Sequence, residues 1–181
     1  MLTGTYKHNV FETVLGWMSI VTSNKGIVRT TLPVASKSEA LEHICSEVKP
    51  SQYSNQDSRI LEAKKIIALY LTGKSTKTNF VYLDFGDANT FSVNVWQMCR
   101  KIPFAETRSY LWLAKMVGNR QAARAVGQVM ARNPLPILIP CHRVILSSGK
   151  IGGFMGKVNR IDIKKKLITL ESSSVSNKLY E

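Results

Sequence analysis

The sequence predicts an α+β protein with a small N-terminal α/β domain and a mostly helical C-terminal domain. The first half alternates strand-like and helix-like hydrophobic patterns, whereas the second half shows helical patterns. Charge divides the chain in the same way: residues 1–90 hold 10 Lys and Arg against 8 Asp and Glu, and residues 91–181 hold 15 against 4. The 181 residues, 44% of them hydrophobic, can form one domain or two small ones with buried cores.

The chain opens with β-branched stretches that predict a hairpin. Residues 13–24 (TVLGWMSIVTSN) and 25–34 (KGIVRTTLPV) are rich in Val, Ile and Thr, and the turn-forming sequence SNKG lies where they meet. Two amphipathic helices are expected next, over residues 36–48 and 57–73. Their apolar positions near the 3.6-residue period are Ala40, Leu41, Ile44 and Val48 in the first helix and Ile60, Leu61, Ile67 and Leu71 in the second.

The second of these helices has clear start and stop signals. Asp57 or Ser58 is expected to cap its N-terminus, and Gly73 follows its last turn. Residues 79–85 (NFVYLDF) predict a short strand, and residues 86–89 (GDAN) are the expected domain boundary. We therefore divide the chain into an N-terminal domain at 1–88, a C-terminal domain at 89–172 and a polar tail at 173–181.

The C-terminal domain is expected to begin with a helix over residues 90–102. Its apolar side carries Phe91, Val95, Met98 and Cys99, so Cys99 is expected in the core.

A helix-turn-helix is predicted next. Ser109 can cap a helix that reaches Val117, Gly118 can end it, and Asn119 can cap a second helix. The second helix should stop at Asn133-Pro134, because proline disfavours the α conformation in the residue before it. Two helices joined by a short turn containing Gly are typical of DNA-binding modules.

The second helix of this pair is rich in small residues. Ala122, Ala123, Ala125 and Gly127 surround one long cation, Arg124. Small residues allow the close backbone approach that a narrow minor groove requires, whereas readout in the major groove uses Asn, Gln and Arg. A helix packed tightly in the core is the alternative.

Composition excludes several classes of protein. The apolar stretches are far shorter than the roughly 20 residues that span a membrane, and the N-terminus lacks a signal-peptide pattern. Three cysteines without CxxC spacing argue against a disulfide framework and a cysteine-rich zinc site, and the pair His43 and Cys45 is a weak metal pattern. We expect a cytoplasmic protein without a metal, a cofactor or a membrane partner. The basic second half favours a polyanionic partner, with a solubilising surface as the alternative.

Five motifs in the second half carry a resemblance to a known family. They are SYLWLAKMVGN (109–119), AARAVGQVMARNP (122–134), PILIPCHRVI (136–145), SSGKIGGF (147–154) and LITLE (167–171). In this order and spacing, residues 91–171 resemble the active-site domain of the O6-alkylguanine-DNA alkyltransferases. The resemblance implies a ribonuclease-H-like N-terminal domain, a winged helix-turn-helix C-terminal domain, and a monomer that acts on double-stranded DNA carrying O6-alkylguanine.

The resemblance also implies the reaction. The protein rotates the damaged guanine out of the duplex, and Cys141 takes the alkyl group from O6 and keeps it, so that each molecule acts once. A thiol with a pKa of about 8.5 is mostly protonated at neutral pH and needs a base. The family pattern assigns that role to His142 through a bridging water, with Glu171 orienting the imidazole.

The remaining roles follow position by position. Tyr110 crowds the DNA backbone and can donate a proton to the departing guanine, and Arg124 fills the vacancy in the base stack. Asn133 orders the turn that leads to Cys141, and Arg143 ties the active-site loop to its domain. The family implies DNA contacts by Ala122, Ala123, Gly127, Arg124 and Tyr110, and a base pocket formed by Cys141, Val144, Phe154 and Met155.

Three features of the sequence depart from the family or leave alternatives. Met155 occupies a position where the family often has Ser, which predicts a reshaped alkyl pocket. The run of lysines at 164–166 is expected to be a solvated helix face, with phosphate contact as the alternative. The competing functions are a damage sensor, which lacks the reactive cysteine in related proteins, and a thiol hydrolase, whose Cys and His are usually distant in sequence. The adjacent Cys141 and His142 favour the alkyltransferase.

Overall fold

The computed structural model describes residues 5–45, 48, 51–76, 78–156 and 160–178. Two compact units make up the chain: residues 1–87 with 134–138, and residues 88–133 with 139–181. Mixed sheet and helices make the fold α+β, and no helix within the described residues is long and apolar enough to cross a membrane.

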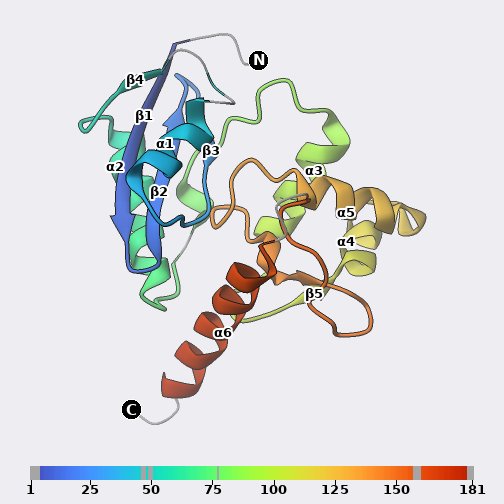
Figure 1. The fold of residues 1–181 in the computed structure, drawn as a ribbon. Helices are drawn as coiled ribbons and strands as arrows, with labels where there is room; N and C mark the ends of the chain where they lie inside the picture. Colours follow the sequence, from blue (N-terminus) through green and yellow to red (C-terminus); the bar gives the residue numbers. More distant parts are fainter. Residues whose placement is uncertain (1–4, 46–47, 49–50, 77, 157–159, 179–181) are drawn as a thin grey trace. The chain divides into compact units, whose positions relative to one another are not determined.

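The first unit is built on four strands: β1 (Tyr6–Thr13), β2 (Gly16–Thr22), β3 (Ile27–Thr30) and β4 (Ser51–Tyr53). Their order in the sheet is β3-β2-β1-β4, antiparallel except for the parallel pair β1 and β4 (Figure 1). The N–H of Ser23 donates to the carbonyl of Gly26 at 2.9 Å and closes the turn between β2 and β3. The predicted hairpin is therefore confirmed, whereas β1 and β4 were not predicted.

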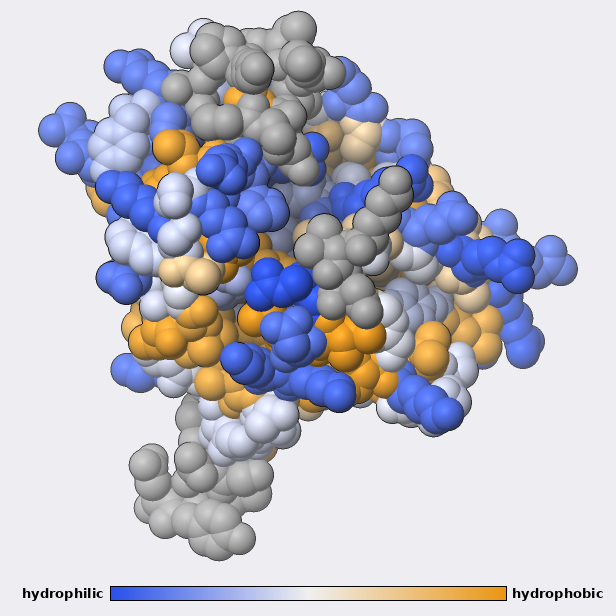
Figure 2. All heavy atoms as spheres, viewed as in Figure 1, coloured by the Kyte–Doolittle hydropathy of each residue, from blue (hydrophilic) through white to orange (hydrophobic). Residues whose placement is uncertain are grey.

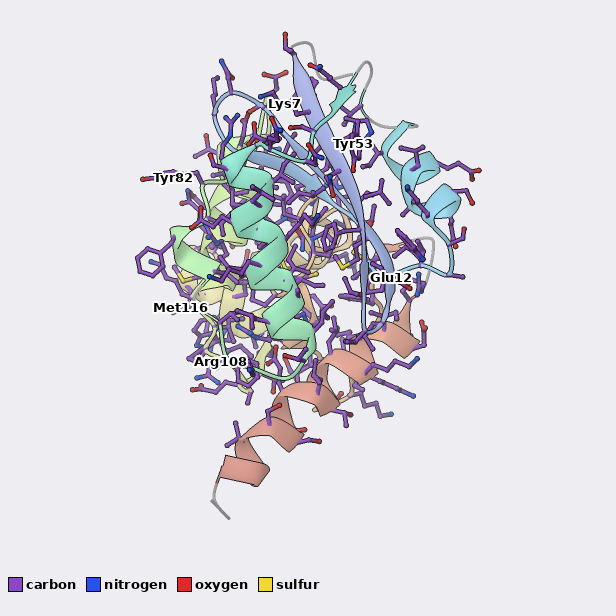
Figure 3. The ribbon with its side chains drawn as sticks, turned by 90° about the vertical axis from the view of Figure 1, so that its left-hand side faces the viewer. Lys7, Glu12, Tyr53, Tyr82, Arg108 and Met116 are labelled. Carbon is purple, nitrogen blue, oxygen red and sulfur yellow. The ribbon has the colours of Figure 1, made fainter. Side chains whose placement is uncertain are left out.

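Two helices cover opposite faces of this sheet, α1 (Lys37–Cys45) and α2 (Ser58–Leu71), as Figures 1 and 3 both show. Side chains alternate across a strand, so β2 sends Ser19 and Val21 towards one face and Met18 and Ile20 towards the other. The Ser19 hydroxyl donates to a carbonyl of α1, and Val21 packs in one cluster with Ile44. Because helices cover both faces, these four side chains of β2 are fully buried.

The helix predictions were right in position but not in every buried residue. Asp57 caps α2 by accepting from the Arg59 N–H, and Gly73 follows with φ +85°. Leu41 is 38% exposed and Leu61 is 47% exposed, so both lie outside the buried stripes that the periodicity assigned to them. They stand next in sequence to Ala40 and Ile60, which are fully buried, and a helix turns by about 100° from one residue to the next.

The strand predicted at residues 79–85 is wrong. The chain there forms a short 3₁₀ turn, η1 (Thr78–Phe80), followed by one isolated parallel bridge between Ile27 and Leu83. Phe80 is 67% exposed and Tyr82 is 78% exposed. The aromatic and β-branched pattern imitates a strand, but only a single bridge links this segment to β3, so no ladder forms.

The described residues of the second unit form the α-helices α3 (Thr90–Arg100), α4 (Tyr110–Met116), α5 (Ala123–Ala131) and α6 (Ile161–Lys178). Asn89 caps α3, whose buried side includes Val95 and Cys99 as predicted. Trp96 of α3 donates from its indole to the Val129 carbonyl of α5 at 3.2 Å. A parallel two-stranded pair, β5 (Arg108–Ser109) with β6 (Val144–Ile145), brings the start of α4 beside the segment that follows residue 143.

The helix-turn-helix has the predicted caps. Ser109 accepts from the Trp112 N–H at 3.0 Å, and Gly118 adopts φ +86°, a left-handed conformation that glycine takes without steric cost. Asn119 caps a 3₁₀ turn, η2 (Arg120–Ala122), which leads directly into α5. Hydrophilic side chains gather over this turn at the right-hand edge of Figure 2.

Helix α6 continues through residues 173–178, which belong to the predicted polar C-terminal tail (Figure 1). Serine hydroxyls in this part of α6 bond back to the helix: the Ser174 hydroxyl donates to the Leu170 carbonyl at 2.7 Å. A polar composition therefore does not end the helix here. Residues 179–181 lie outside the described residues.

Asp57 links the α2 cap to the sheet. This buried carboxylate accepts from Arg59 at 2.8 Å and from Lys7 of β1 at 3.2 Å, and these cations keep its pKa well below the usual value. Lys7 lies near the beginning of β1, where β4 with Tyr53 pairs with it. Glu12 lies near the other end of β1 (Figure 3).

We expect Asp57→Ala to lower the free energy of unfolding by about 1–2 kcal/mol, because it removes the helix cap together with two ion pairs. Urea denaturation at neutral pH measures this change. Gln56→Ala, at the exposed neighbouring position, is the matched control. Equal unfolding midpoints for the two variants would contradict the role of the cap.

Candidate active site

Cys141 begins a 3₁₀ turn, η3 (Cys141–Arg143), that leads into β6. Its side chain is only 2% exposed. Asn133, buried just after α5, donates from its side-chain amide to the Cys141 Sγ at 3.0 Å and to the Ile139 carbonyl at 3.0 Å. One amide thus orders the turn and also contacts the sulfur.

His142 and Glu171 form a buried pair. The His142 Nε2 lies 2.8 Å from the Glu171 Oε1, and neither residue is more than 2% exposed. Hydrogen bonds from His142 and Arg143 outweigh burial and lower the pKa of Glu171 to about 2, so the carboxylate is ionised and can only accept. The Nε2 therefore carries the proton. Burial lowers the pKa of His142, which leaves Nδ1 as the basic nitrogen of a neutral ring.

Glu171 has two further donors. The Arg143 guanidinium donates to both of its oxygens at 3.0–3.1 Å and also to the Ile102 carbonyl at 2.7 Å. The Ala105 N–H donates to Oε2 at 2.8 Å, from a residue with φ +63°. Glu171 of α6 therefore holds the turn after Cys141 and the loop after α3 in one place.

The thiol itself is not activated by burial. Desolvation raises the pKa of Cys141 to about 11, because a buried thiolate loses its hydration, and the Asn133 amide and the Lys164 charge only partly oppose this. A nucleophilic thiolate at neutral pH therefore requires a base that removes the proton. His142, the next residue in the chain, has the neutral ring that such a base needs.

A cavity of about 470 Å³ opens onto Cys141. Helix α5, the start of α4 and the glycine-rich segment 146–156 line it, so all of its walls belong to the second unit. The lining includes these residues that the sequence analysis singled out: Tyr110, Ala123, Arg124, Gly127, Cys141, Phe154 and Met155.

Two other expected residues do not line this cavity. Val144 is fully buried, and its carbonyl accepts from Lys164; Ala122 lies in the 3₁₀ turn before α5. Met155 lines the wall with φ +56°, a left-handed conformation that is uncommon for a side chain other than Gly, Asn or Asp. The departure from the family pattern therefore lies in the cavity wall.

The prediction that the lysines at 164–166 form a solvated helix face is wrong for Lys164. Lys165 and Lys166 are exposed as expected, but Lys164 has no exposed surface, and its Nζ donates to the Val144 carbonyl at 2.6 Å. Sequence reasoning missed Ala105 and Lys164, and it also missed cavity-lining residues such as Met130 and Leu146. A helical-period count would have found Lys164, because it lies three residues before buried Leu167 and seven before buried Glu171.

No cluster of three His, Cys, Asp or Glu side chains with metal-binding geometry occurs in the part of the chain that the structure describes. His43 lies 4.0 Å from Glu39 on α1, and the side chain of Cys45 lies outside the described part.

Comparisons with known proteins agree with this site. Residues 90–173 match the family described as 6-O-methylguanine DNA methyltransferase, DNA binding domain. A methylated-DNA–protein-cysteine methyltransferase of Methanosarcina acetivorans is 33% identical over 164 residues, which are 91% of this chain and 97% of the relative. A constitutive methylated-DNA–protein-cysteine methyltransferase of Bacillus subtilis is 37% identical over 119 residues, which are 66% of this chain and 70% of that protein.

A solved structure has the same fold. Mycobacterium tuberculosis OGT in complex with DNA superposes with a TM-score of 0.74 and 28% identity, over 94% of each chain. The Methanosarcina relative spans nearly the whole chain, and the motifs around Cys141 are present. The chain therefore belongs to the family of methylated-DNA–protein-cysteine methyltransferases, which are DNA-binding enzymes of DNA repair.

Proposed function

We propose that this protein removes the alkyl group from O6-alkylguanine in duplex DNA and transfers it irreversibly to Cys141. One observation carries the proposal: the Cys141 Sγ adjoins a cavity in the same unit as the helix-turn-helix, beside a buried histidine–carboxylate pair. The Mycobacterium tuberculosis relative was solved with DNA bound, which supports DNA as the partner.

The transfer follows from the protonation states of the site. His142 takes the thiol proton at Nδ1 through a water molecule, and the ionised Glu171 stabilises the imidazolium. The thiolate attacks the alkyl carbon, the S–C bond forms as the C–O6 bond breaks, and the electron pair stays on the guanine. Burial raises the pKa of Tyr110 to about 12, so its phenol is protonated at neutral pH and can supply a proton to the departing base.

Access to the site requires an extruded base. Arg124 is exposed at the first turn of α5 and also lines the cavity, which suits a side chain that replaces the flipped guanine in the stack. Helices α4 and α5 act as the helix-turn-helix of a winged module, and segment 146–156 acts as its wing. The first unit has a ribonuclease-H-like fold and serves as a scaffold.

The direct test is the mass of the intact protein after incubation with duplex DNA that contains O6-methylguanine. We expect one added methyl group per molecule, located on Cys141 by peptide mapping. Tight binding to the lesion without any gain in mass would support a damage sensor instead.

Cys141→Ser should abolish transfer and keep DNA affinity, because the serine hydroxyl is far less acidic than a thiol and the exposed DNA-binding residues are unchanged. Mass spectrometry and a mobility-shift titration measure the two properties. Cys99→Ala is the matched control, since Cys99 is buried but does not line the cavity; it should still gain one methyl group. Residual transfer in Cys141→Ser would assign the nucleophile elsewhere.

Arg124→Ala should weaken binding to duplexes with a lesion about tenfold more than binding to undamaged duplexes, a difference of about 1.4 kcal/mol. Fluorescence anisotropy with both duplexes measures it. Arg120→Ala, at an exposed arginine outside the cavity lining, should weaken both equally through lost phosphate contact. An equal loss for Arg124→Ala would remove its role in base extrusion.

Because of Glu171, the free energy of unfolding should depend on pH in the acid range. Its pKa is about 2 in the folded protein, below the ordinary value of 4.5, so its stabilisation is complete above pH 4.5 and is lost as pH falls towards 2. Glu171→Gln should lower the free energy of unfolding by about 3 kcal/mol near pH 7, because the largely buried guanidinium of Arg143 loses its charged partner, and should flatten this acid dependence.

Urea denaturation across this pH range tests the acid dependence. Glu106→Gln is the control, since Glu106 is an exposed carboxylate paired with Arg108. An acid profile of Glu171→Gln that matches the parent would contradict the assignment.

A further inference from the structure

Lys164 is a fully buried lysine behind the wall of the cavity. It lies near the start of α6 with no exposed surface, while the next two lysines are exposed. Lysine is almost never fully buried without a partner, because an ammonium loses its hydration there. The burial of this ammonium therefore requires a physical explanation.

The ammonium has two carbonyl acceptors and two aromatic neighbours. The Lys164 Nζ donates to the Val144 carbonyl at 2.6 Å and to the Gly153 carbonyl at 3.3 Å. It also lies 5.7 Å from the ring centroids of Tyr110 and Phe154, within cation–π range. Among the residues that the structure describes, its contacts include no ion pair with a carboxylate.

These contacts join two parts of the cavity wall. Tyr110 comes from α4, Gly153 and Phe154 come from the glycine-rich segment, and all three line the cavity. The Tyr110 hydroxyl also donates to the Gly153 carbonyl at 3.5 Å. One buried cation thus holds the phenol and the loop carbonyl together in the cavity wall.

The ionisable groups around Lys164 come from three elements. Tyr110 faces it from α4, Cys99 from α3, and Cys141 and His142 from η3. Burial lowers the pKa of Lys164 to about 8, and the Lys164 charge in turn lowers the pKa of Cys141 against the effect of burial. In the proposed reaction Cys141 becomes an anion before the attack, and Tyr110 does so only when it gives its proton to the departing base. The first charge partner of Lys164 therefore appears when the thiol loses its proton.

We propose that Lys164 is a positioning residue of the transfer reaction: its buried ammonium holds the Val144 and Gly153 carbonyls and the Tyr110 ring, and it supplies the positive charge that stabilises the Cys141 thiolate. This inference rests on the proposed alkyl transfer. The three consecutive lysines at 164–166 thus have two separate roles. Lys164 supplies a buried charge, and Lys165 and Lys166 form part of the solvated surface.

The first experiment compares Lys164→Met with Lys165→Met. Methionine keeps most of the length of lysine without its charge, and Lys165 is an exposed neighbour on the same helix. Single-turnover methyl transfer from duplex O6-methylguanine should slow in Lys164→Met by about tenfold for each unit by which the thiol pKa rises. Binding to undamaged duplex should not change, because a buried side chain does not reach phosphate.

A pH profile separates the charge from a merely structural effect. The rate at which iodoacetamide modifies Cys141, followed by peptide mapping, reports the thiolate fraction without DNA. In Lys164→Met the profile should move to higher pH, and in Lys164→Arg, which retains a cation, it should stay close to the parent. A folded Lys164→Met with the profile and transfer rate of Lys165→Met would overturn the proposal.

A second measurement follows the Lys164 ammonium itself. Electrostatic coupling is reciprocal, so a negative charge at position 141 should raise the titration midpoint of Lys164. Lysine labelled with ¹³C at Cε can be titrated by NMR in Cys141→Asp and in the uncharged Cys141→Asn, with Lys164→Arg to assign the signal. Equal midpoints would overturn the charge role. Failure of transfer in the parent protein would instead overturn the proposed function, while the iodoacetamide profiles and the NMR midpoints would still report on Lys164.

Discussion

The buried carboxylate of Glu171 is the interaction on which the rest of the active site depends. It accepts from the His142 imidazole at 2.8 Å, from the Arg143 guanidinium and from the Ala105 N–H at 2.8 Å. An ionised carboxylate is stable in such a place only when several donors replace its hydration. Because those donors come from η3 and from the loop after α3, satisfying the charge also fixes these segments on α6. The orientation of His142 is a consequence of that packing.

The two positive charges of the site have different partners. Arg143 is neutralised by Glu171, whereas Lys164 contacts carbonyls and aromatic rings. Burial alone disfavours a thiolate at Cys141, so a nearby base, an amide donor and an uncompensated cation must act together. A buried thiol of this kind is a poor nucleophile by itself. It becomes reactive when a base removes its proton and a nearby cation stabilises the thiolate.

The cavity and the proposed DNA-binding surface share residues. Tyr110 begins α4, and Ala123, Arg124 and Gly127 belong to α5, yet all four line the cavity above Cys141. A helix with small side chains leaves this space open, and Gly127 would place an added Cβ only 4.0 Å from the Tyr110 ring. The proposed binding of a duplex at this surface would place an extruded base next to the sulfur without a separate channel.

The sequence by itself determined the features that depend on neighbours along the chain. The hairpin turn at residues 23–26, the caps Asp57 and Ser109 and the adjacent Cys141 and His142 are local, because a cap or turn is satisfied within about four residues. Tertiary structure decided what depends on contacts between distant segments. Lys164 is buried by partners 11 and 20 residues away, and residues 79–85 found one bridge instead of a ladder. The parallel partner of β1 and the left-handed Ala105 were likewise set by the segments they meet, since burial and strand pairing are properties of the packed chain.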